Sequence, residues 1–431
     1  MKIAIVGTGI AGNVAAYRLS RDHDITVFEA DDHVGGHTHT VDVDWKNRCY
    51  AVDTGFIVFN DWTYPNFISL LDELAVESQP TTMSFSVRCE RSGLEYNGST
   101  LNTLFAQRVN LLRPGFHRMI LDILRFNREA PMLLAVPDDG MSLGGYLSAG
   151  RYSRQFVEHY IVPMGSAVWS ADPRQLLEIP ARFFIQFFHN HGMLSVNQRP
   201  QWRVIRGGSR AYVARLIAPF ADRIRLRTPV EWIRRLPAGI ELKAHQQTPQ
   251  HFDRVFLACH SDQALRLLAD ASAEERAVLG AIPYQENEAI LHTDETLLPR
   301  RPLAWAAWNY HIRERRGDKA AAPAPAAVTY NMNILQGLAA PAQFCVTLNH
   351  RDAIDPRKII RAVTYHHPIF TPGGIAAQAR QAQINGPRHT YFCGAYWRFG
   401  FHEDGVVSAL AAVKHFNERE EREQPHLRRA G

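Results

Sequence analysis

The chain has 431 residues, with 48 basic and 43 acidic side chains and a formal net charge of +5. A hydrophobic content of 46% and a charged content of 21% are those of a globular protein and exclude a disordered one. The length predicts more than one core, most simply two lobes. Because no basic side chains are concentrated in one region, we expect no nucleic-acid binding.

The cysteines give no sign of cross-linking or metal binding. No two of them form a CxxC pair, which argues against a disulfide framework, a zinc site or an iron-sulfur cluster. We therefore expect no metal, a cytoplasmic location and five reduced thiols, Cys49, Cys89, Cys259, Cys345 and Cys393.

We expect no targeting or membrane-spanning segment. The sequence opens directly into a strand-like run after Lys2, and from this we expect no signal peptide. No run of about eighteen apolar residues predicts a membrane-spanning helix. Peripheral contact with a membrane stays open.

The first segment combines a strand, a glycine turn, a helix and a second strand. Residues 2–6 form a short, mainly apolar run of strand length, and the sequence GTGIAG follows at 7–12. Residues 13–19 favour a helix, and the apolar run 25–28 ends on Glu29. This order predicts a dinucleotide site, with a plain βαβ turn as the alternative.

Each glycine of this turn has a distinct physical role in such a site. Gly7 permits the tight turn, Gly9 lets the backbone approach a pyrophosphate, and Gly12 lets the helix pack close to the strand. The helix N-terminus would face the phosphates with free N–H groups. Glu29 would accept hydrogen bonds from a ribose.

The loop after Glu29 carries the paired glycines Gly35 and Gly36, then His37 and Thr38. It resembles the FAD fingerprint of the amine oxidase and phytoene desaturase superfamily, where Glu is followed by a loop ending in GG, a basic residue and Thr. Many members have Arg after GG, and a neutral imidazole pairs more weakly with phosphate than a guanidinium does. A surface turn is the alternative.

Residues 50–56 predict another strand that ends in a glycine turn. This segment is similar to the superfamily's DxG element, which brings backbone under the isoalloxazine ring and would place Gly55 there. For Asp53, a purely structural role in the turn is an equal alternative.

We interpret residues 80–200 as an insertion that begins a substrate lobe. Residues 82–88 alternate polar and apolar side chains as a half-buried strand does, and residues 101–188 favour helices. Trp169 and Trp202 either pack in a core or wall an apolar substrate pocket.

Within this insertion, residues 113–128 predict a basic amphipathic helix. It contains Arg113, Arg118, Arg125 and Arg128 among apolar residues. Such a helix either lies on anionic lipid or packs one face and exposes the other to solvent.

The chain then returns to the cofactor lobe twice. The glycine pair at 207–208 opens a helix, and residues 224–233 predict a strand in which Val230 matches the superfamily's backbone contact to adenine. An apolar strand at 252–260 resembles the strand that closes the central sheet. His260 and Cys259 at its end are structural residues or, alternatively, a catalytic pair.

The last segment, 390–410, predicts a strand, a Gly-Ala turn, an aromatic loop and a helix that starts near Asp404 and Gly405. It resembles the final FAD motif of the superfamily, in which the helix start donates N–H groups to the flavin N1 and O2 region. Ala395 stands where the superfamily often has an acid. Cys393 is the one candidate for a covalent flavin link, and non-covalent binding is the expectation.

Together these motifs look closest to bacterial flavoproteins associated with cyclopropane-fatty-acyl-synthase-like methyltransferases. The resemblance implies an α/β fold: a Rossmann-like, GR2-type FAD-binding domain with an inserted α+β substrate domain. The predicted FAD-binding domain comprises residues 1–79, 201–282 and 385–431. The predicted substrate domain comprises residues 80–200 and 283–384.

The resemblance also implies a function, an FAD-dependent oxidoreductase that oxidises or desaturates an apolar substrate such as an acyl chain, with the electron acceptor unassigned. A flavin amine oxidase and a non-enzymatic FAD- or NAD-binding protein are the alternatives. The predicted catalytic residues are Tyr365, His366, Tyr396 and Trp397. The predicted FAD contacts are Gly7, Gly9, Ile10, Ala11, Gly12, Glu29, Ala30, Gly35, Gly36, His37, Thr38, Gly55, Phe56, Val230, Gly394, Asp404, Gly405 and Val406.

Overall fold

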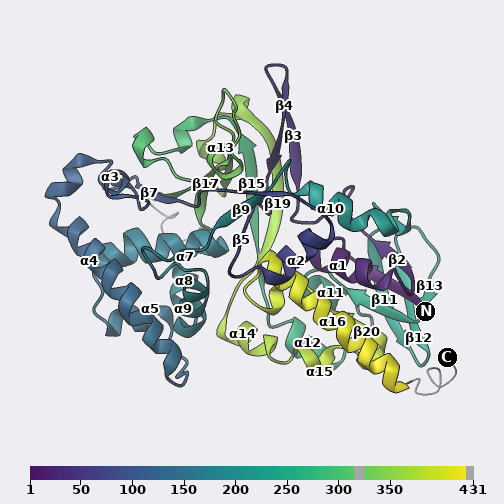
Figure 1. Ribbon diagram of the computed structural model, residues 1–431. Helices are drawn as coiled ribbons and strands as arrows, with labels where there is room; N and C mark the ends of the chain where they lie inside the picture. Colours follow the sequence, from purple (N-terminus) through teal and green to yellow (C-terminus); the bar gives the residue numbers. More distant parts are fainter. Residues whose placement is uncertain (315–324, 424–431) are drawn as a thin grey trace.

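The computed structural model describes residues 1–314 and 325–423 of the chain. Figure 1 shows two regions: α1, β2 and the N-terminus lie at one end, and α3, α4 and α5 lie at the other. Two large sheets organise these regions.

The first region is built on a five-stranded parallel sheet with the order β10-β2-β1-β14-β20. Side chains on neighbouring positions of β1 enter different cores, with Ile3 and Ile5 on one face and Ala4 and Val6 on the other. A strand buried on both faces reads as the continuous apolar run seen in the sequence. The five strands are β1 (Lys2–Val6), β2 (Asp24–Phe28), β10 (Ile224–Arg225), β14 (Arg254–Leu257) and β20 (Thr390–Phe392).

Helices and a small sheet cover the two faces of the parallel sheet. The face of Ile3 packs against α1 (Ile10–Leu19), α2 (Pro65–Glu73), α10 (Arg210–Ile217) and α16 (His402–Glu423). The face of Ala4 packs against the sheet β11-β12-β13 and several helices. These elements are β11 (Val230–Leu236), β12 (Gly239–Ala244), β13 (Gln250–Phe252), α11 (Ser261–Leu267), α12 (Ala273–Leu279), α14 (Pro372–Gln378) and α15 (Gln381–Ile384).

The second region is built on a seven-stranded sheet with the order β19-β15-β18-β17-β16-β7-β8. Only the β16-β7 pair is parallel among its described strands. The strands are β7 (Phe85–Cys89), β8 (Glu95–Asn97), β15 (Tyr284–His292), β16 (Trp308–Ile312), β17 (Ala327–Asn331), β18 (Cys345–Leu348) and β19 (Ile359–Pro368).

A layer of helices packs on this mixed sheet through an aromatic core that includes Phe126, Phe156, Phe184 and Phe188. These helices are α3 (Leu101–Leu104), α4 (Pro114–Glu129), α5 (Leu143–Ala149), α6 (Arg154–Phe156), α7 (Val162–Trp169), α8 (Pro173–Glu178) and α9 (Ala181–Asn190). Among the described residues no helix is both long and apolar enough to span a membrane.

Short strands connect the two regions. The hairpin β3 (Thr40–Trp45) and β4 (Arg48–Asp53) projects from the molecule beside β15, and α13 (Met332–Gln336) lies close to β4 (Figure 1). A three-stranded sheet joins β5 (Val58–Asn60), β9 (Trp202–Ile205) and β6 (Ser78–Pro80).

This architecture confirms the predicted α/β class, with a Rossmann-like parallel sheet and a second α+β region. The strands from the two predicted insertions share the mixed sheet, and the exact domain boundaries stay predictions. The predicted strand at 224–233 is wrong in one respect, because it is broken between β10 and β11. Arg227 has a left-handed φ of 49°, and Pro229 has no N–H to donate.

Candidate active site

Of the three glycines in the turn after β1, Gly9 alone borders space that a ligand could fill. A Cβ at Gly12 would lie 2.0 Å from the Gly7 carbonyl oxygen, and Gly7 has a φ of 101° and lies close to Ala258. A Cβ at Gly9 would meet nothing within 4 Å. Gly7 and Gly12 therefore serve the fold, while Gly9 borders open space.

Two helix N-termini converge beside this turn. Helix α1 begins after Gly9 without a side-chain cap, although Ile10 and Ala11 in its first turn are buried. A Cβ at Gly405 would lie 2.6 Å from the Cγ2 atom of Ile10, so the start of α16 packs closely on the start of α1. Helix N-termini carry partial positive charge and free N–H groups, so this place suits an anion.

The Glu29 carboxylate fixes the glycine turn through hydrogen bonds. It is buried and accepts hydrogen bonds from the backbone N–H of Thr8 at 2.8 Å, from the Thr8 hydroxyl, and from the backbone N–H of Asp31 at 3.0 Å. The glycine pair packs on the same turn, because a Cβ at Gly36 would lie 3.2 Å from the Cα of Gly9. The predicted residues Glu29, Gly35 and Gly36 are thus brought together with Gly9.

The segment before Val230 runs along the end of β2. The backbone N–H of Thr228 donates to the carbonyl of Glu29 at 2.7 Å, and the N–H of Arg227 donates to the carbonyl of Asp31 at 2.9 Å. Val230 begins β11 two residues later, and Ala30 is exposed between the two bonded carbonyls. This arrangement places the predicted adenine contact next to the predicted ribose contact.

Close backbone approach also explains Gly55. The Phe56 N–H donates to the His37 carbonyl at 2.7 Å, and a Cβ at Gly55 would lie 2.0 Å from that same carbonyl oxygen. The Phe56 ring stacks on His402 with a centroid distance of 3.5 Å and an interplanar angle of 7°. The loop of His37 and the turn of Gly55 therefore form one unit against the start of α16.

A buried polar triangle locks this unit in place. The Thr38 hydroxyl lies 2.6 Å from the Tyr212 hydroxyl and 3.1 Å from Nε2 of His402, and the Tyr212 hydroxyl lies 2.7 Å from the same nitrogen. Burial lowers the pKa of His402 well below its usual range. Thr38 thus acts within the fold by joining the glycine-pair loop to α10 and α16.

Asp53 is a structural acid in this structure. Its buried carboxylate accepts hydrogen bonds from the Thr40 hydroxyl at 2.6 Å, from the Ser209 N–H at 2.9 Å and hydroxyl at 2.8 Å, and from the Gln336 amide at 3.1 Å. These donors belong to β3, to the turn before α10 and to α13. Of the two roles left open by the sequence, the structure supports the turn acid.

Asp53→Ala is expected to lower the free energy of unfolding by about 2–4 kcal/mol, because the buried donors lose their acceptor. Burial raises the pKa of Asp53 from 3.8 to about 6. The folded protein therefore binds this proton more tightly, and the contribution of Asp53 to stability falls as the pH rises from 3.8 to about 6. The stability difference between wild type and Asp53→Ala, measured by urea unfolding of the apoprotein, should shrink across this window. A difference that grows with pH would contradict this assignment.

A group of rings surrounds His37. Its ring centroid lies 4.9 Å from that of Tyr365, 5.4 Å from that of His367 and 5.9 Å from that of His260. Burial lowers the pKa of His37 to about 4, and its buried Nε2 has no hydrogen-bond partner among the described residues. A buried polar atom without a partner indicates a place for a ligand.

The predicted catalytic residues Tyr365 and His366 face opposite ways, because β19 alternates its side chains. Tyr365 is buried, and its hydroxyl lies 3.0 Å from the Thr54 hydroxyl. His366 is exposed, and its Nε2 lies 3.9 Å from the Glu286 carboxylate. Only Tyr365 shares the interior with His37.

The predicted residues Tyr396 and Trp397 lie in the core beneath β14 and β20. Both are buried, with a ring distance of 4.9 Å, and a Cβ at Gly394 would lie 2.3 Å from the Tyr396 ring. Burial raises the pKa of Tyr396 well above its usual range. Cys393 before this turn is also buried, and burial raises the pKa of its thiol.

Two predicted FAD contacts in the first turn of α16, Asp404 and Val406, have roles in the fold. The Asp404 carboxylate accepts a hydrogen bond from the Phe401 N–H at 2.9 Å, and burial raises its pKa to about 6. This bond caps the helix start, as an acid at the third helical position does. Val406 is buried in the core between α1 and α16.

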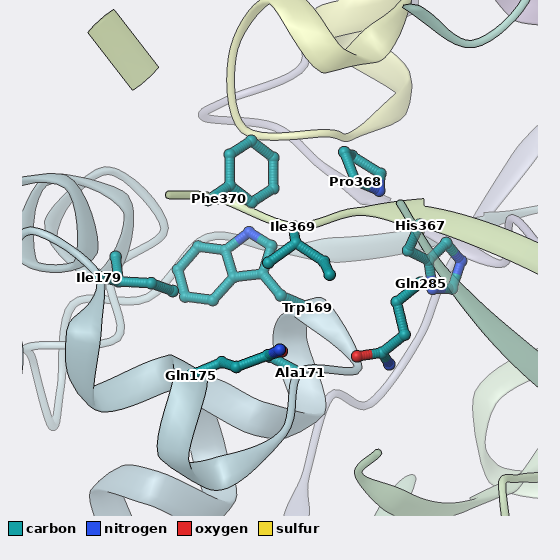
Figure 2. Close-up of a pocket in the computed structure, with 9 residues that line it drawn as sticks. All are labelled: Trp169, Ala171, Gln175, Ile179, Gln285, His367, Pro368, Ile369 and Phe370. Carbon is teal, nitrogen blue, oxygen red and sulfur yellow. The ribbon is translucent and has the colours of Figure 1, made fainter. Parts of the chain in front are cut away.

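A small apolar pocket, with a volume of about 10 Å³, lies on the other side of His367, between α7, α8 and the end of β19. Figure 2 shows the Trp169 indole below Ile369 and Phe370, with Gln175 and Gln285 on its opposite side. Within the described chain, the lining holds no Asp, Glu, Lys or Arg. It consists of Trp169, Ala171, Gln175, Ile179, Gln285, His367, Pro368, Ile369 and Phe370.

Aromatic side chains extend the pocket wall toward the start of α16. The Trp169 ring lies 4.9 Å from Phe187 on α9, and its Nε1 donates to the Phe399 carbonyl at 3.2 Å. The rings of Phe187 and Phe401 stack at 4.9 Å. His367 belongs both to the pocket lining and to the ring group of His37, so the pocket adjoins the predicted flavin position.

Residues 10–314 match the protein family described as flavin containing amine oxidoreductase. The chain belongs to this family. A search among curated proteins gave no match.

Several solved structures share the fold along nearly the whole chain. Cyclohexylamine oxidase from Brevibacterium oxydans IH-35A superposes with a TM-score of 0.69 at 16% identity, covering 97% of this chain and 99% of that one. A fatty acid isomerase from P. acnes that produces CLA gives 0.67 at 17% identity, with coverages of 96% and 98%. Putrescine oxidase bound to putrescine gives 0.67 at 14% identity, with coverages of 97% and 99%.

The protein is therefore an FAD-dependent oxidoreductase. Its residues fit the cofactor: the space at Gly9 and the uncapped start of α1 suit a pyrophosphate, and the unpaired Nε2 of His37 lies beside the glycine-pair loop. The individual FAD contacts and catalytic roles stay predictions.

Several residues that line the pocket could not be identified from the sequence. Trp169 was one of two candidate wall residues, and it lines the pocket, whereas Tyr396, Trp397 and His366 do not. Phe370, Ile369 and Gln285 carry no motif. The apolar character of residues 369–370 just after β19 was the one signal in the sequence that points to them.

Proposed function

We propose that this oxidoreductase oxidises or desaturates an apolar substrate such as an acyl chain. Within the family, we propose that it belongs with the bacterial flavoproteins associated with cyclopropane-fatty-acyl-synthase-like methyltransferases. The observation that carries the proposal is the uncharged lining of the pocket next to His37.

The lining favours an acyl chain over an amine. A protonated amine needs a carboxylate or another acceptor to offset its desolvation, and the described lining offers only two carboxamides and an imidazole. Burial lowers the pKa of His367 to about 3, so this imidazole stays neutral. Methylene groups instead gain about 0.8 kcal/mol each on burial against such a surface.

The similar structures include proteins named for both substrate classes. Cyclohexylamine oxidase and putrescine oxidase are named for amines, and the P. acnes protein is a fatty acid isomerase. Amine oxidation is therefore the second candidate function, supported by the aromatic rings around Trp169, which can also face a cation.

Desaturation removes a hydride from one carbon and a proton from its neighbour, and a C=C bond forms between them. Bound FAD supplies the hydride acceptor. Trp169, Ile179 and Phe370 would hold the chain and exclude water from it. Tyr365 stays protonated at neutral pH, because burial raises its pKa to about 12, so it can orient groups but cannot take the proton.

Imidazoles offer the proton a route to solvent. The Nε2 atom of the neutral His37 has no hydrogen-bond partner among the described residues and lies in the interior, where the reaction would release the proton. The centroid of His260 lies 5.9 Å from His37 and 6.3 Å from the exposed His366, whose Nε2 lies 3.9 Å from the Glu286 carboxylate. In this proposal His366 moves the proton outward, which is the part of its predicted role that an exposed side chain can perform.

The test is product analysis of the purified holoenzyme incubated with an acyl phospholipid and, separately, with simple amines. The proposal predicts loss of two hydrogen atoms from the acyl chain, detected by mass spectrometry. Oxidation of amines with unchanged acyl chains would reject it in favour of the second candidate.

Gln175→Trp is expected to lower kcat/KM for the acyl substrate about tenfold or more, because an indole at this exposed position on α8 fills the pocket mouth. Flavin content should not change. Glu178→Trp is the matched control, since Glu178 is exposed on the same helix and does not line the pocket. Unchanged turnover in Gln175→Trp would show that substrate binds elsewhere.

A further inference from the structure

We propose that residues 101–136, here called the outer segment, dock this enzyme on an anionic lipid bilayer. The segment contains α3, the turn η1 (Arg108–Leu112), α4 and the turn η2 (Ala130–Ala135). In Figure 1, α3 and α4 lie at the end of the molecule far from β2 and the N-terminus.

The outer segment exposes large apolar side chains at high density. Leu112 is 83% exposed, Leu101 77%, Met132 68% and Leu121 60%. More than half of the exposed large hydrophobic side chains in the described residues fall within these positions. Exposed apolar side chains concentrated in one segment favour an interaction surface, whereas scattered single residues would need no explanation. The full set is Leu101, Val109, Leu111, Leu112, Leu121, Leu124, Met132 and Val136.

Helix α4 has apolar side chains on two opposite faces, and only one of these faces is buried. Phe116, Met119 and Phe126 point into the aromatic core, so the helix already buries one apolar face. Leu121 and Leu124 lie on the opposite side, on a stripe with the exposed residues at 117 and 128 that follows helical spacing. The exposed leucines therefore form a second apolar stripe that nothing in the described chain covers.

Cationic side chains surround this stripe. The segment carries Arg108, Arg113, Arg118, Arg125 and Arg128 against Asp122 and Glu129. Asp122 is buried and lies 3.3 Å from Arg118 and 3.2 Å from Arg125, so it contributes no exposed negative charge. Leucine interleaved with arginine matches a bilayer surface, where apolar groups enter the acyl boundary and cations meet anionic headgroups.

The turn η2 is fixed in a shape that presents its apolar side chains. The Arg182 guanidinium donates to the carbonyls of Leu133 at 3.0 Å, Val136 at 2.6 Å and Leu134 at 2.8 Å. These bonds give three backbone carbonyl groups of the turn a hydrogen-bond donor, while the side chains of Met132 and Val136 remain exposed. The acids that follow, Asp138 and Asp139, bond the backbone N–H groups of residues 140 and 141.

The outer segment also lies close to the substrate pocket. The turn η2 packs against α9, and Phe183 and Phe187 of α9 pack against Trp169 and Phe370. A single helix therefore separates the proposed docking surface from the pocket lining. A second copy of the chain is a poorer occupant, because a symmetric contact would bring the arginines of the two copies together.

The test is flotation of the full-length, FAD-loaded protein with vesicles of phosphatidylcholine alone or mixed with phosphatidylglycerol. We expect binding to the mixed vesicles, weaker binding to the neutral ones, and a decrease at high salt. The double variant Leu121→Asp/Leu124→Asp should lower partitioning about tenfold or more. Val196→Asp, at an exposed position outside the segment, is the matched control and should bind as wild type does.

Two results would overturn the proposal. One is equal flotation of wild type and the Leu121→Asp/Leu124→Asp variant, or no flotation of either. The other is a dimer in size-exclusion chromatography that this variant dissociates, which would make the surface a contact between copies. Flavin absorbance and thermal unfolding of the variant test whether it is folded. Because flotation needs no turnover, its outcome is independent of the proposed acyl oxidation.

Discussion

Gly9→Val should give a folded protein that no longer binds FAD. A Cβ at Gly9 meets nothing within 4 Å, and its φ of −62° and ψ of 176° suit any residue. The loss of stability should not exceed about 1 kcal/mol, the usual cost of an apolar N-cap. In the holoenzyme the valine would occupy the space of the pyrophosphate, and each lost charge-assisted hydrogen bond costs about 1.5–3 kcal/mol.

The expected fall in FAD affinity is therefore about a hundredfold or more, measured by fluorescence titration of the apoprotein. Gly12→Val is the contrasting variant, because its Cβ would lie 2.0 Å from the Gly7 carbonyl oxygen and should prevent folding of the turn. Wild-type FAD affinity in Gly9→Val would show that the pyrophosphate does not bind at this turn.

Glu29→Ala is expected to release the flavin as well, for a different reason. The buried carboxylate bonds Thr8 and Asp31 and faces the predicted ribose position, so its loss loosens the turn and removes an acceptor. At about 1.5–3 kcal/mol for a hydrogen bond to a charged group, FAD affinity should fall about tenfold to a hundredfold. Flavin absorbance after gel filtration measures the loss.

Thr8→Val separates the two contributions of Glu29. It removes the Thr8 hydroxyl, which donates to Glu29 and accepts from the Gly35 N–H at 3.3 Å, but it keeps the carboxylate. A ribose role for Glu29 predicts that Thr8→Val keeps most of its FAD. If Thr8→Val loses as much flavin as Glu29→Ala, Glu29 acts only by holding the turn.

The glycine turn could be predicted from sequence because the strand, the turn and the helix follow one another in the chain. The contact that excludes a Cβ at Gly12 is local, since it is made with the Gly7 carbonyl oxygen. The contacts at Gly7 and Gly55 are made with Ala258 and His37, which only the fold brings close. The role of Asp53 could not be decided, because three of its donors come from Thr40, Ser209 and Gln336, which are distant in sequence.

The pocket could not be predicted, since its walls come from separate elements. Trp169 ends α7, Gln285 lies on β15, and Phe370 follows β19, and only the mixed sheet brings them together. The outer segment was predicted in part. The sequence indicated an amphipathic α4, but apolar residues lie on both of its sides, and tertiary packing decides that Met119 is buried and Leu121 exposed.

The effect of having His37 where many members of the superfamily have Arg could not be judged from the sequence. The sequence shows His in place of Arg after the glycine pair, which weakens the case for phosphate pairing. The structure surrounds His37 with Tyr365, His260 and His367, and burial keeps it neutral. A permanently charged guanidinium would lack a counter-ion among these described rings.

Anaerobic titration of the purified holoenzyme, followed at the flavin absorption band, shows whether an acyl chain held in the pocket of Trp169 and Phe370 gives its electrons to the flavin. Acyl phospholipid should bleach the flavin, simple amines should bleach it little, and bleaching should be slower in Gln175→Trp. Bleaching by amines with no response to acyl phospholipid would refute acyl oxidation in this pocket.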